Sequence, residues 1–337
     1  MSRPFFVDAP KAELHLHIEG TISPEFLLLL AERNGVALPY ASINEIEQSY
    51  RFNHFDDFLI AYRSGVALLR TERDFYDLAH RYMQRAAADG VVHLEAAVGP
   101  HSHLSRGIAP SVFMDGLLAG FDKAARDFGM TYAVIVGLQR ERGPEAGFEA
   151  LTLLSPYRDR IAALGLQGQE ASYPPAPFAG VYRKARDWGW KAVVHAGEGG
   201  PPEYVAQALD ALSADRIDHG IRAWEDPDLI KRLVDEQVPL TVCPLSNIAC
   251  RNFERMEDHP LADMFRAGVC VTLNSDDPPL FGGYLNDNFQ AAVDTFALTT
   301  PEQHAILQNG FTAAFLPHDK RQAYGQMLDA HVLVHAG

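Results

Sequence analysis

Two histidines near the start of the chain, His15 and His17, lie two residues apart at the end of a short apolar run. Residues at i and i+2 of a strand point to the same face, so these two imidazoles could bind one metal ion. A strand with two buried, hydrogen-bonded histidines is the alternative explanation for a lone pair. The pair by itself therefore does not decide between a metal site and the protein core.

Three more polar clusters each follow an apolar run, and this recurrence favours a metal site. The clusters are His195-Ala-Gly-Glu198, Asp218-His-Gly220 and Asn274-Ser-Asp-Asp-Pro278. Four such clusters, each placed just after an apolar run, are hard to explain as packing. They indicate one metal site that is built from the ends of several strands.

The predicted metal ligands are His15, His17, His195 and Asp276. Three imidazoles and one carboxylate suit zinc, with iron and manganese as alternatives. An open coordination position would hold water, and bound zinc lowers the pKa of that water towards about 7. The chemistry that these residue types predict is metal-assisted hydrolysis.

Three further polar residues are candidates for catalysis beside these ligands. Glu198 lies three residues after His195, where we expect a proton donor rather than a ligand. His219 could hold the attacking water or stabilise a developing alkoxide, and Asp277 could contact the substrate. Taken separately, Glu198 could cap a helix, His219 could be a buried histidine and Asp277 could be a turn residue. The occurrence of all three beside the predicted ligands favours a functional role. For the pair His101 and His103 we expect a loop or substrate contact, since nothing else supports a second ion.

The elements that must position these residues alternate along the chain. Eight apolar, β-branched runs are predicted as strands, at 12–17, 91–98, 132–138, 162–166, 192–195, 216–219, 240–243 and 269–273. Helical periodicity lies between most of them, at 74–88, 112–128, 177–188, 203–212, 226–237 and 261–267. This alternation predicts an α/β fold, a (β/α)8 TIM barrel, whose chemistry lies at the carboxyl ends of the strands. All four polar clusters occupy that end.

The segment 18–88 is much longer than a single crossover helix requires. Ser23 as N-cap and Pro24 in the first turn predict a helix that stops near Asn34, and more helices are expected at 45–50 and 55–69. Because the segment leaves the barrel at its catalytic end, we expect this helical insertion to cap the pocket. A decorative helical layer is the alternative. The chain 1–337 is then a single metal-dependent hydrolase domain.

Composition narrows the class of protein and its partners. The chain has 337 residues, 47% of them apolar and 22% charged, as in soluble globular proteins. A formal net charge of −15 opposes binding to nucleic acid or anionic membranes, and no apolar stretch approaches the ~20 residues of a membrane helix. Three scattered cysteines and the lack of an apolar leader near the start predict a cytoplasmic protein. We expect a small-molecule substrate, and an oligomer is compatible with the sequence.

These motifs resemble those of the adenosine/adenine deaminase family of the amidohydrolase superfamily. The resemblance runs in order over nearly the whole chain, through Pro10-Lys-Ala-Glu-Leu-His-Leu-His-Ile-Glu-Gly20, His195-Ala-Gly-Glu198, Arg216-Ile-Asp-His-Gly220, Cys243-Pro-Leu-Ser246 and Asn274-Ser-Asp-Asp-Pro278. The Pro-Cys-x-x-Cys part of the signature of the cytidine and tRNA-type deaminases is absent.

The resemblance implies zinc-dependent hydrolytic deamination of a 6-aminopurine. It assigns the metal to the four ligands predicted above. It implies that Glu198 protonates purine N1 while hydroxide adds at C6, and that His219 supports the hydroxide and the intermediate. Asp277 would contact N7, after which ammonia leaves.

Within that family the chain is more similar to the adenine branch, which implies conversion of adenine to hypoxanthine and ammonia in purine salvage. Glu19 stands where nucleoside deaminases usually carry an aspartate that helps to hold ribose, and both Glu19 and Glu170 are expected to contact substrate. Ala96 and Ala97 replace an aromatic pair that the adenine branch carries after the second strand. Adenosine, aminodeoxyfutalosine and N6-substituted adenines are therefore alternative substrates. A different metal-dependent hydrolase and a binding protein without activity are the more distant alternatives.

Overall fold

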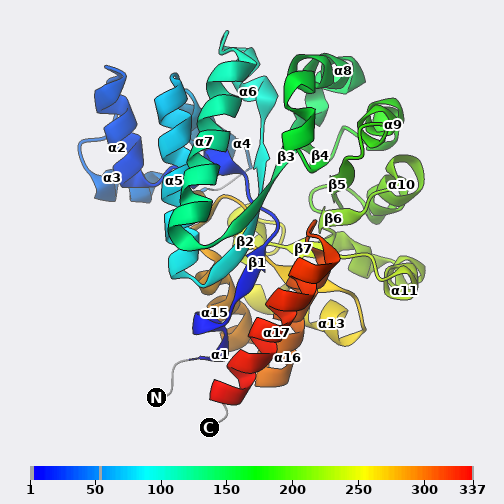
Figure 1. The fold of residues 1–337 in the computed structure, drawn as a ribbon. Coiled ribbons are helices and arrows are strands. Elements are labelled where there is room, and N and C mark those ends of the chain that lie inside the picture. Colours follow the sequence, from blue (N-terminus) through cyan, green and yellow to red (C-terminus); the bar gives the residue numbers. More distant parts are fainter. Residues whose placement is uncertain (1–3, 53–54, 336–337) are drawn as a thin grey trace.

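The computed structural model of the protein describes residues 4–52 and 55–335. Within these residues, eight parallel strands hydrogen-bond in sequence order, and helices lie outside them (Figure 1). The strands are β1 (Lys11–Glu13), β2 (Val91–Val98), β3 (Thr131–Gln139), β4 (Ala163–Gln167), β5 (Lys191–Ala196), β6 (Arg216–His219), β7 (Leu240–Val242) and β8 (Val271–Leu273). The predicted (β/α)8 barrel is confirmed.

The helices outside the barrel form in the connections between strands. They are α5 (Glu72–Ala88), α7 (Pro110–Phe128), α8 (Gly143–Leu154), α9 (Ala179–Arg186), α10 (Pro202–Leu212), α11 (Pro227–Glu236) and α13 (Leu261–Arg266). The six predicted helices are all observed, with bounds shifted by a few residues. Helix α8 was not predicted, and Gly143, Pro144 and Gly147 weaken the helical pattern of this stretch. It nonetheless buries residues 147, 150, 151 and 154, which is helical spacing.

The first strand is shorter than the predicted run 12–17, and Asn274 provides the reason. Its side-chain oxygen accepts hydrogen bonds from the backbone N–H groups of Leu14 (2.8 Å) and His15 (3.2 Å). These two amides therefore bond to a side chain instead of a neighbouring strand. The ladder stops at Glu13, and the two histidines follow it in a more irregular segment.

The barrel closes where this segment meets the end of β8. The backbone N–H of His17 donates to the carbonyl of Asp276 (3.0 Å), and the N–H of Asp276 donates to the carbonyl of His15 (3.2 Å). Leu16 and Asp276 form an isolated parallel bridge across the same junction. Three predicted metal ligands, His15, His17 and Asp276, thus lie at this junction, which we call the seam of the barrel. Helix α16 (Thr300–Ala313) packs outside the seam against β1 and β8 (Figure 1).

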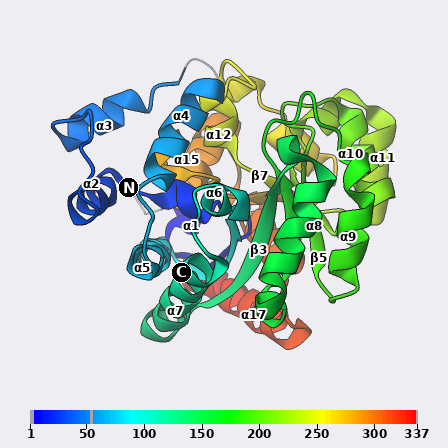
Figure 2. The ribbon, with the colours of Figure 1, turned by 90° about the horizontal axis from the view of Figure 1, so that it is seen from above.

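The connection from β1 to β2 carries α2 (Pro24–Arg33), α3 (Ile43–Ser49) and α4 (Phe55–Val66) before α5. The Ser23 hydroxyl accepts a hydrogen bond from Phe26 N, and Pro24 opens the helix, as predicted. Helix α5 packs against α7 and β2 as an ordinary barrel helix, whereas α2 and α3 lie at the periphery (Figure 2). That the segment 18–88 acts as a cap stays a prediction.

The remaining helices are short or follow the last strand. They are α1 (Phe5–Asp8), α6 (Pro100–Leu104), α12 (Pro244–Ala249), α14 (Pro278–Phe281), α15 (Leu285–Phe296) and α17 (His318–His335). Across residues 4–52 and 55–335, no helix combines the length and the apolar character needed to cross a membrane.

Candidate functional site

The four predicted metal ligands converge at the carboxyl end of the barrel. Nε2 of His195 lies 3.1 Å from Nε2 of His15 and 3.2 Å from Nε2 of His17. Oδ1 of Asp276 lies 3.4 Å and 3.2 Å from the same two histidine atoms. Neighbouring ligand atoms around tetrahedral zinc lie about 3.3 Å apart, given metal–ligand distances of about 2.0–2.1 Å. The measured separations fit one ion shared by the four groups.

The hydrogen bonds behind the ligands support the same interpretation. Nδ1 of His15 lies 3.1 Å from the carbonyl oxygen of Thr241, which can only accept, so this nitrogen carries the ring proton. Burial lowers the pKa of His195 to about 4, so that ring is neutral at pH 7. Nε2 of His15 then faces His195 at 3.1 Å, a separation that suits two nitrogen ligands of one cation. Four converging donor groups favour a metal ion over a proton.

Asp218, for which the sequence predicted no role, lies directly behind two of the candidate ligands. Its carboxylate accepts a hydrogen bond from the Thr241 hydroxyl (2.6 Å) and lies 3.6 Å from Nδ1 of His15. Its other oxygen lies 3.2 Å from Nδ1 of His195, as a contact rather than a well-aligned hydrogen bond. A carboxylate behind two ligating imidazoles orients both rings and makes them better ligands. Its place in the motif Asp218-His-Gly220, beside a candidate catalytic histidine, was the available signal.

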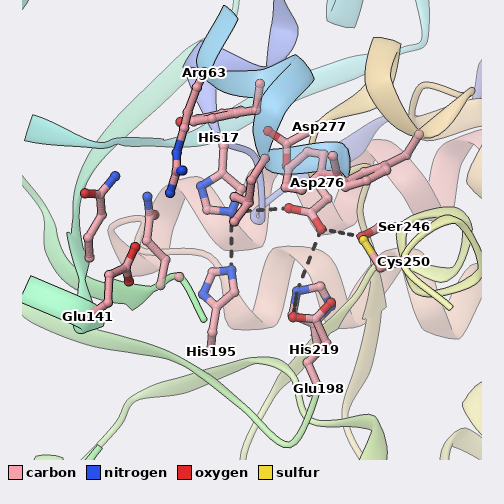
Figure 3. Close-up of a pocket in the computed structure, with 17 residues that line it drawn as sticks. His17, Arg63, Glu141, His195, Glu198, His219, Ser246, Cys250, Asp276 and Asp277 are labelled. Atoms are coloured by element: carbon pink, nitrogen blue, oxygen red, sulfur yellow. Dashed lines mark hydrogen bonds and ion pairs between the residues drawn. The ribbon is translucent and has the colours of Figure 1, made fainter. Parts of the chain in front are cut away.

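Asp276 is held in a single orientation from both its backbone and its side chain. The Ser246 hydroxyl donates to Oδ2 (2.6 Å), which leaves Oδ1 facing the histidines (Figure 3). The backbone φ of Asp276 is 65°, and that of His219 is 61°. Side chains with a β-carbon rarely adopt this left-handed region, and strain of this kind is concentrated at functional sites. The two residues also meet, with Nε2 of His219 3.7 Å from Oδ2 of Asp276.

Glu198 follows β5 and lies beside this cluster with the properties of a proton donor. Its Oε2 is 3.6 Å from Nε2 of His219. Burial, together with the negative charges of Asp276 and Glu170, raises the pKa of Glu198 to about 8. The carboxyl group therefore keeps its proton at neutral pH, as general-acid catalysis requires.

Glu170 holds the loop that carries Glu198. One of its carboxylate oxygens accepts from the N–H of Gly197 (2.6 Å), and the other accepts from the N–H groups of Glu198 and Gly199 (2.9 Å each). Three backbone donors converge on one side chain from the loop after β4. Glu170 is not among the residues that line the pocket, so the substrate contact expected from the sequence stays a prediction.

We expect the Glu170→Gln variant to lose about 10–100-fold in kcat while retaining its metal. An amide group offers one acceptor oxygen and turns its NH2 group towards backbone donors, which would displace Glu198. Misplacing a reacting group by about 1 Å can cost about 10²-fold. Steady-state rates and elemental analysis test this, with Glu203→Gln on the exposed surface of α10 as the matched control. Unchanged kcat would show that the loop needs no such support.

Asp277 lies against the backbone of Gly20. A β-carbon at position 20 would come within 1.6 Å of Oδ1 of Asp277, so only glycine fits there. Burial, then the neighbouring charge of Asp276, raises the pKa of Asp277 well above its usual value. A protonated carboxyl group at this position could donate a hydrogen bond to a purine nitrogen.

The pocket in front of these groups has about 690 Å³ of space, including its opening to solvent. Its wall includes the predicted residues His17, His195, Glu198, His219, Asp276 and Asp277. Helix α4 adds Phe58, Leu59, Tyr62 and Arg63, and Figure 3 shows Arg63 at the rim. The rings of Phe58 and Phe281 lie 4.7 Å apart, which joins α4 to α14 beside Asp277.

Glu19 is buried beneath the pocket wall rather than among its lining residues. Its Oε1 accepts hydrogen bonds from Nε2 of His103 (2.7 Å) and from the backbone N–H of Gly99 (2.9 Å). Of the pair His101 and His103, His103 is therefore a hydrogen-bond partner of Glu19. Oε2 of Glu19 has no hydrogen-bond partner, and its contact with a substrate stays a prediction.

A (β/α)8 barrel with three histidines and an aspartate at the carboxyl ends of its strands defines a class of metal-binding barrel enzymes. Comparison with known proteins narrows this class. The family model described as adenosine deaminase matches residues 10–331. The chain therefore belongs to the adenosine deaminase family.

Individual relatives share most of their length with this chain. An adenine deaminase of Streptomyces coelicolor is 46% identical over 322 residues, which is 95% of each chain. One from Caulobacter vibrioides is 44% identical over 99% of this chain and 97% of its own. The crystal structure of adenine deaminase from Arthrobacter aurescens superposes with a TM-score of 0.94 at 41% identity, covering 96% of this chain and 99% of that one.

A more distant structure is informative about the metal. An amidohydrolase from Burkholderia ambifaria, solved with bound Zn, has a TM-score of 0.89 and 27% identity, with coverage of 98% of this chain and 94% of that one. The match places a zinc-containing relative on the same fold.

Proposed function

We propose that this protein is a metal-dependent adenine deaminase that converts adenine and water to hypoxanthine and ammonia. The observation that carries the proposal is the buried Glu198 carboxyl group, whose pKa is raised to about 8, beside four converging candidate metal ligands. The relatives named adenine deaminase at 41–46% identity support the choice of substrate. The chemistry needs an acid and an activated water at the same time, and this pocket has residues suited to both.

Each polar side chain has one task in the proposed reaction. Glu198 donates its proton to N1 of the purine, which makes C6 electrophilic. Asp277 donates a hydrogen bond to N7 and fixes the ring in the pocket. His219, within 3.7 Å of both Glu198 and Asp276, stabilises the oxygen that adds at C6. One proton of the added water passes to the 6-amino group, which leaves as ammonia, and the other returns to Glu198 as the C6 carbonyl forms.

Zinc is the ion that we propose for the cluster of His15, His17, His195 and Asp276. When bound, it supplies the Lewis acidity that makes water nucleophilic near neutral pH. The ligand types, their separations and the Zn-containing amidohydrolase support zinc, while iron and manganese suit the same donors. A role in cytoplasmic purine salvage belongs to the same proposal, and the free cysteines Cys243, Cys250 and Cys270 are consistent with a reducing compartment.

Deamination of an N6-substituted adenine is the second candidate, and the pocket wall is the reason to test it. Phe58, Leu59, Tyr62 and Phe281 give this wall an apolar surface that an alkyl group on N6 could contact. The polar side chains that address N1 and N7 would be unchanged, so the mechanism would be the same.

The test is a parallel assay of adenine, adenosine and an N6-alkyladenine with zinc-loaded protein, followed by the change in ultraviolet absorbance. We expect the highest kcat/KM with adenine. A higher value with the N6-alkyladenine or with adenosine would replace the substrate while keeping the mechanism. If no 6-aminopurine reacts while the metal is bound, the proposed activity is wrong.

A further inference from the structure

A chain of hydrogen bonds leads from a backbone amide to the candidate catalytic residue His219. At its far end, the N–H of Leu261 lies 3.1 Å from Nδ1 of His259. A backbone amide can only donate, so Nδ1 of His259 accepts and carries no proton. Burial lowers the pKa of His259 to about 3, so the ring is neutral and its one proton lies on Nε2.

The next two hydrogen bonds run through Asn247 with the same order of donor and acceptor. Nε2 of His259 donates to Oδ1 of Asn247 at 3.1 Å, which determines how the amide is oriented. The amide nitrogen of Asn247 then lies 3.2 Å from Nδ1 of His219 and donates to it. The reverse orientation would need a proton on Nδ1 of His259, where the Leu261 N–H already points.

The chain leaves His219 with its proton on one nitrogen. Nδ1 accepts from Asn247, so in the neutral ring the proton is on Nε2, which faces Glu198 and Asp276. Asn247 is fully buried, and His219 and His259 are 1% and 3% exposed. Water has little access to these bonds and could not easily replace them. The position of the proton therefore depends on side chains outside the pocket.

We propose that Asn247 and His259 are positioning residues that orient the His219 ring and place its proton on Nε2. A proton there makes His219 a hydrogen-bond donor to the oxygen that adds to the substrate, rather than a base or a metal ligand. The effect on rate rests on the proposed function, whereas the position of the proton does not.

The test combines nitrogen-15 NMR of histidine-labelled, zinc-loaded protein with kinetics. The spectrum distinguishes protonated from unprotonated ring nitrogens, and the signals of His219 are assigned by their loss in His219→Asn. We expect Nε2 of His219 to carry the proton in the unmodified protein. A proton on Nδ1 would overturn the proposal without any variant.

The decisive variant is Asn247→Asp, which keeps the shape of the side chain but removes its donor. A carboxylate accepts from His219, so the ring proton should move to Nδ1, and kcat should fall about 10²-fold or more at nearly constant KM and metal content. Asn44→Asp on the exposed surface of α3, at the periphery of the fold, makes the same change and should alter kcat less than about twofold. An unchanged proton position together with unchanged kcat in Asn247→Asp would refute the proposal.

Variants at His259 separate positioning from packing. His259→Gln places an amide donor near the former Nε2 and should keep the proton of His219 on Nε2, with a smaller loss of kcat. His259→Phe fills space without a donor and should give a mixture of ring forms. If His259→Gln and His259→Phe behave alike, the contact is structural. If the proton moves as expected but no 6-aminopurine reacts in any form of the protein, the proposed activity fails and this inference stands.

Discussion

The Asp276→Ala variant is expected to lose both its metal and its activity. Oδ1 of Asp276 lies within 3.4 Å of two histidine nitrogens, and its removal takes away the only carboxylate among the four predicted ligands. Metal ions contribute several kcal/mol to charge stabilisation in such reactions, which corresponds to about 10³-fold or more in kcat. Elemental analysis should find far less than one zinc per chain, and initial rates with adenine should approach the background.

The control for this variant is Asp159→Ala, which removes an exposed aspartate far from the pocket. It should bind zinc and deaminate adenine as the unmodified protein does. Full zinc occupancy in Asp276→Ala would reject Asp276 as a ligand. Circular dichroism should accompany both measurements, because Asp276 also lies at the seam of the barrel.

The Glu198→Gln variant is expected to keep its metal and lose at least about 10²-fold in kcat. Glutamine has a similar shape but cannot give up a proton as an acid. In the unmodified protein the pKa of Glu198 is raised to about 8, so its acid form is present at neutral pH and disappears as the pH rises through that value. Activity should therefore fall on the alkaline side, and Glu198→Gln should lack this fall.

The measurement is kcat for adenine from pH 6 to pH 10, with zinc content determined on the same samples. Glu203→Gln, on the exposed surface of α10, should reproduce the profile of the unmodified protein. Turnover at the normal rate in Glu198→Gln would exclude the proposed acid. Loss of zinc would instead indicate that Glu198 helps to hold the metal.

The residues predicted from the sequence to bind metal were found because their chemistry is rare in the core of a protein. His15, His17, His195 and Asp276 each follow an apolar run, and the barrel places the ends of its strands together. Their convergence follows from strand order alone.

The supporting residues were not assigned, since their importance depends on partners distant in sequence. Asp218 matters through Thr241 and two histidines, and Asn247 matters through His259. The side chain of Glu170 was expected to contact substrate, but its hydrogen bonds are to a loop about 28 residues later. Only the three-dimensional arrangement shows which polar groups meet.

Two secondary-structure elements, the first strand and helix α8, were not predicted correctly, and both differences have physical causes. The first strand was predicted too long because a side chain, Asn274, replaces the backbone ladder at Leu14 and His15. Helix α8 was missed because its glycines and proline weaken the helix signal while its buried face supplies the stability. In both places a contact made elsewhere in the fold outweighs the local preference.

The seam of the barrel has a consequence for how the protein is made. The amides of Leu14 and His15 bond to Asn274 across 260 and 259 residues, and the same junction contains three of the predicted ligands. At about 5–20 residues per second, a ribosome needs roughly 10 to 50 seconds to add that length of chain. Until then His15 and His17 lack the carboxylate of Asp276, and the barrel is not closed. Capture of the ion is therefore a late event in biosynthesis, and contacts of such long range favour slow completion of the fold.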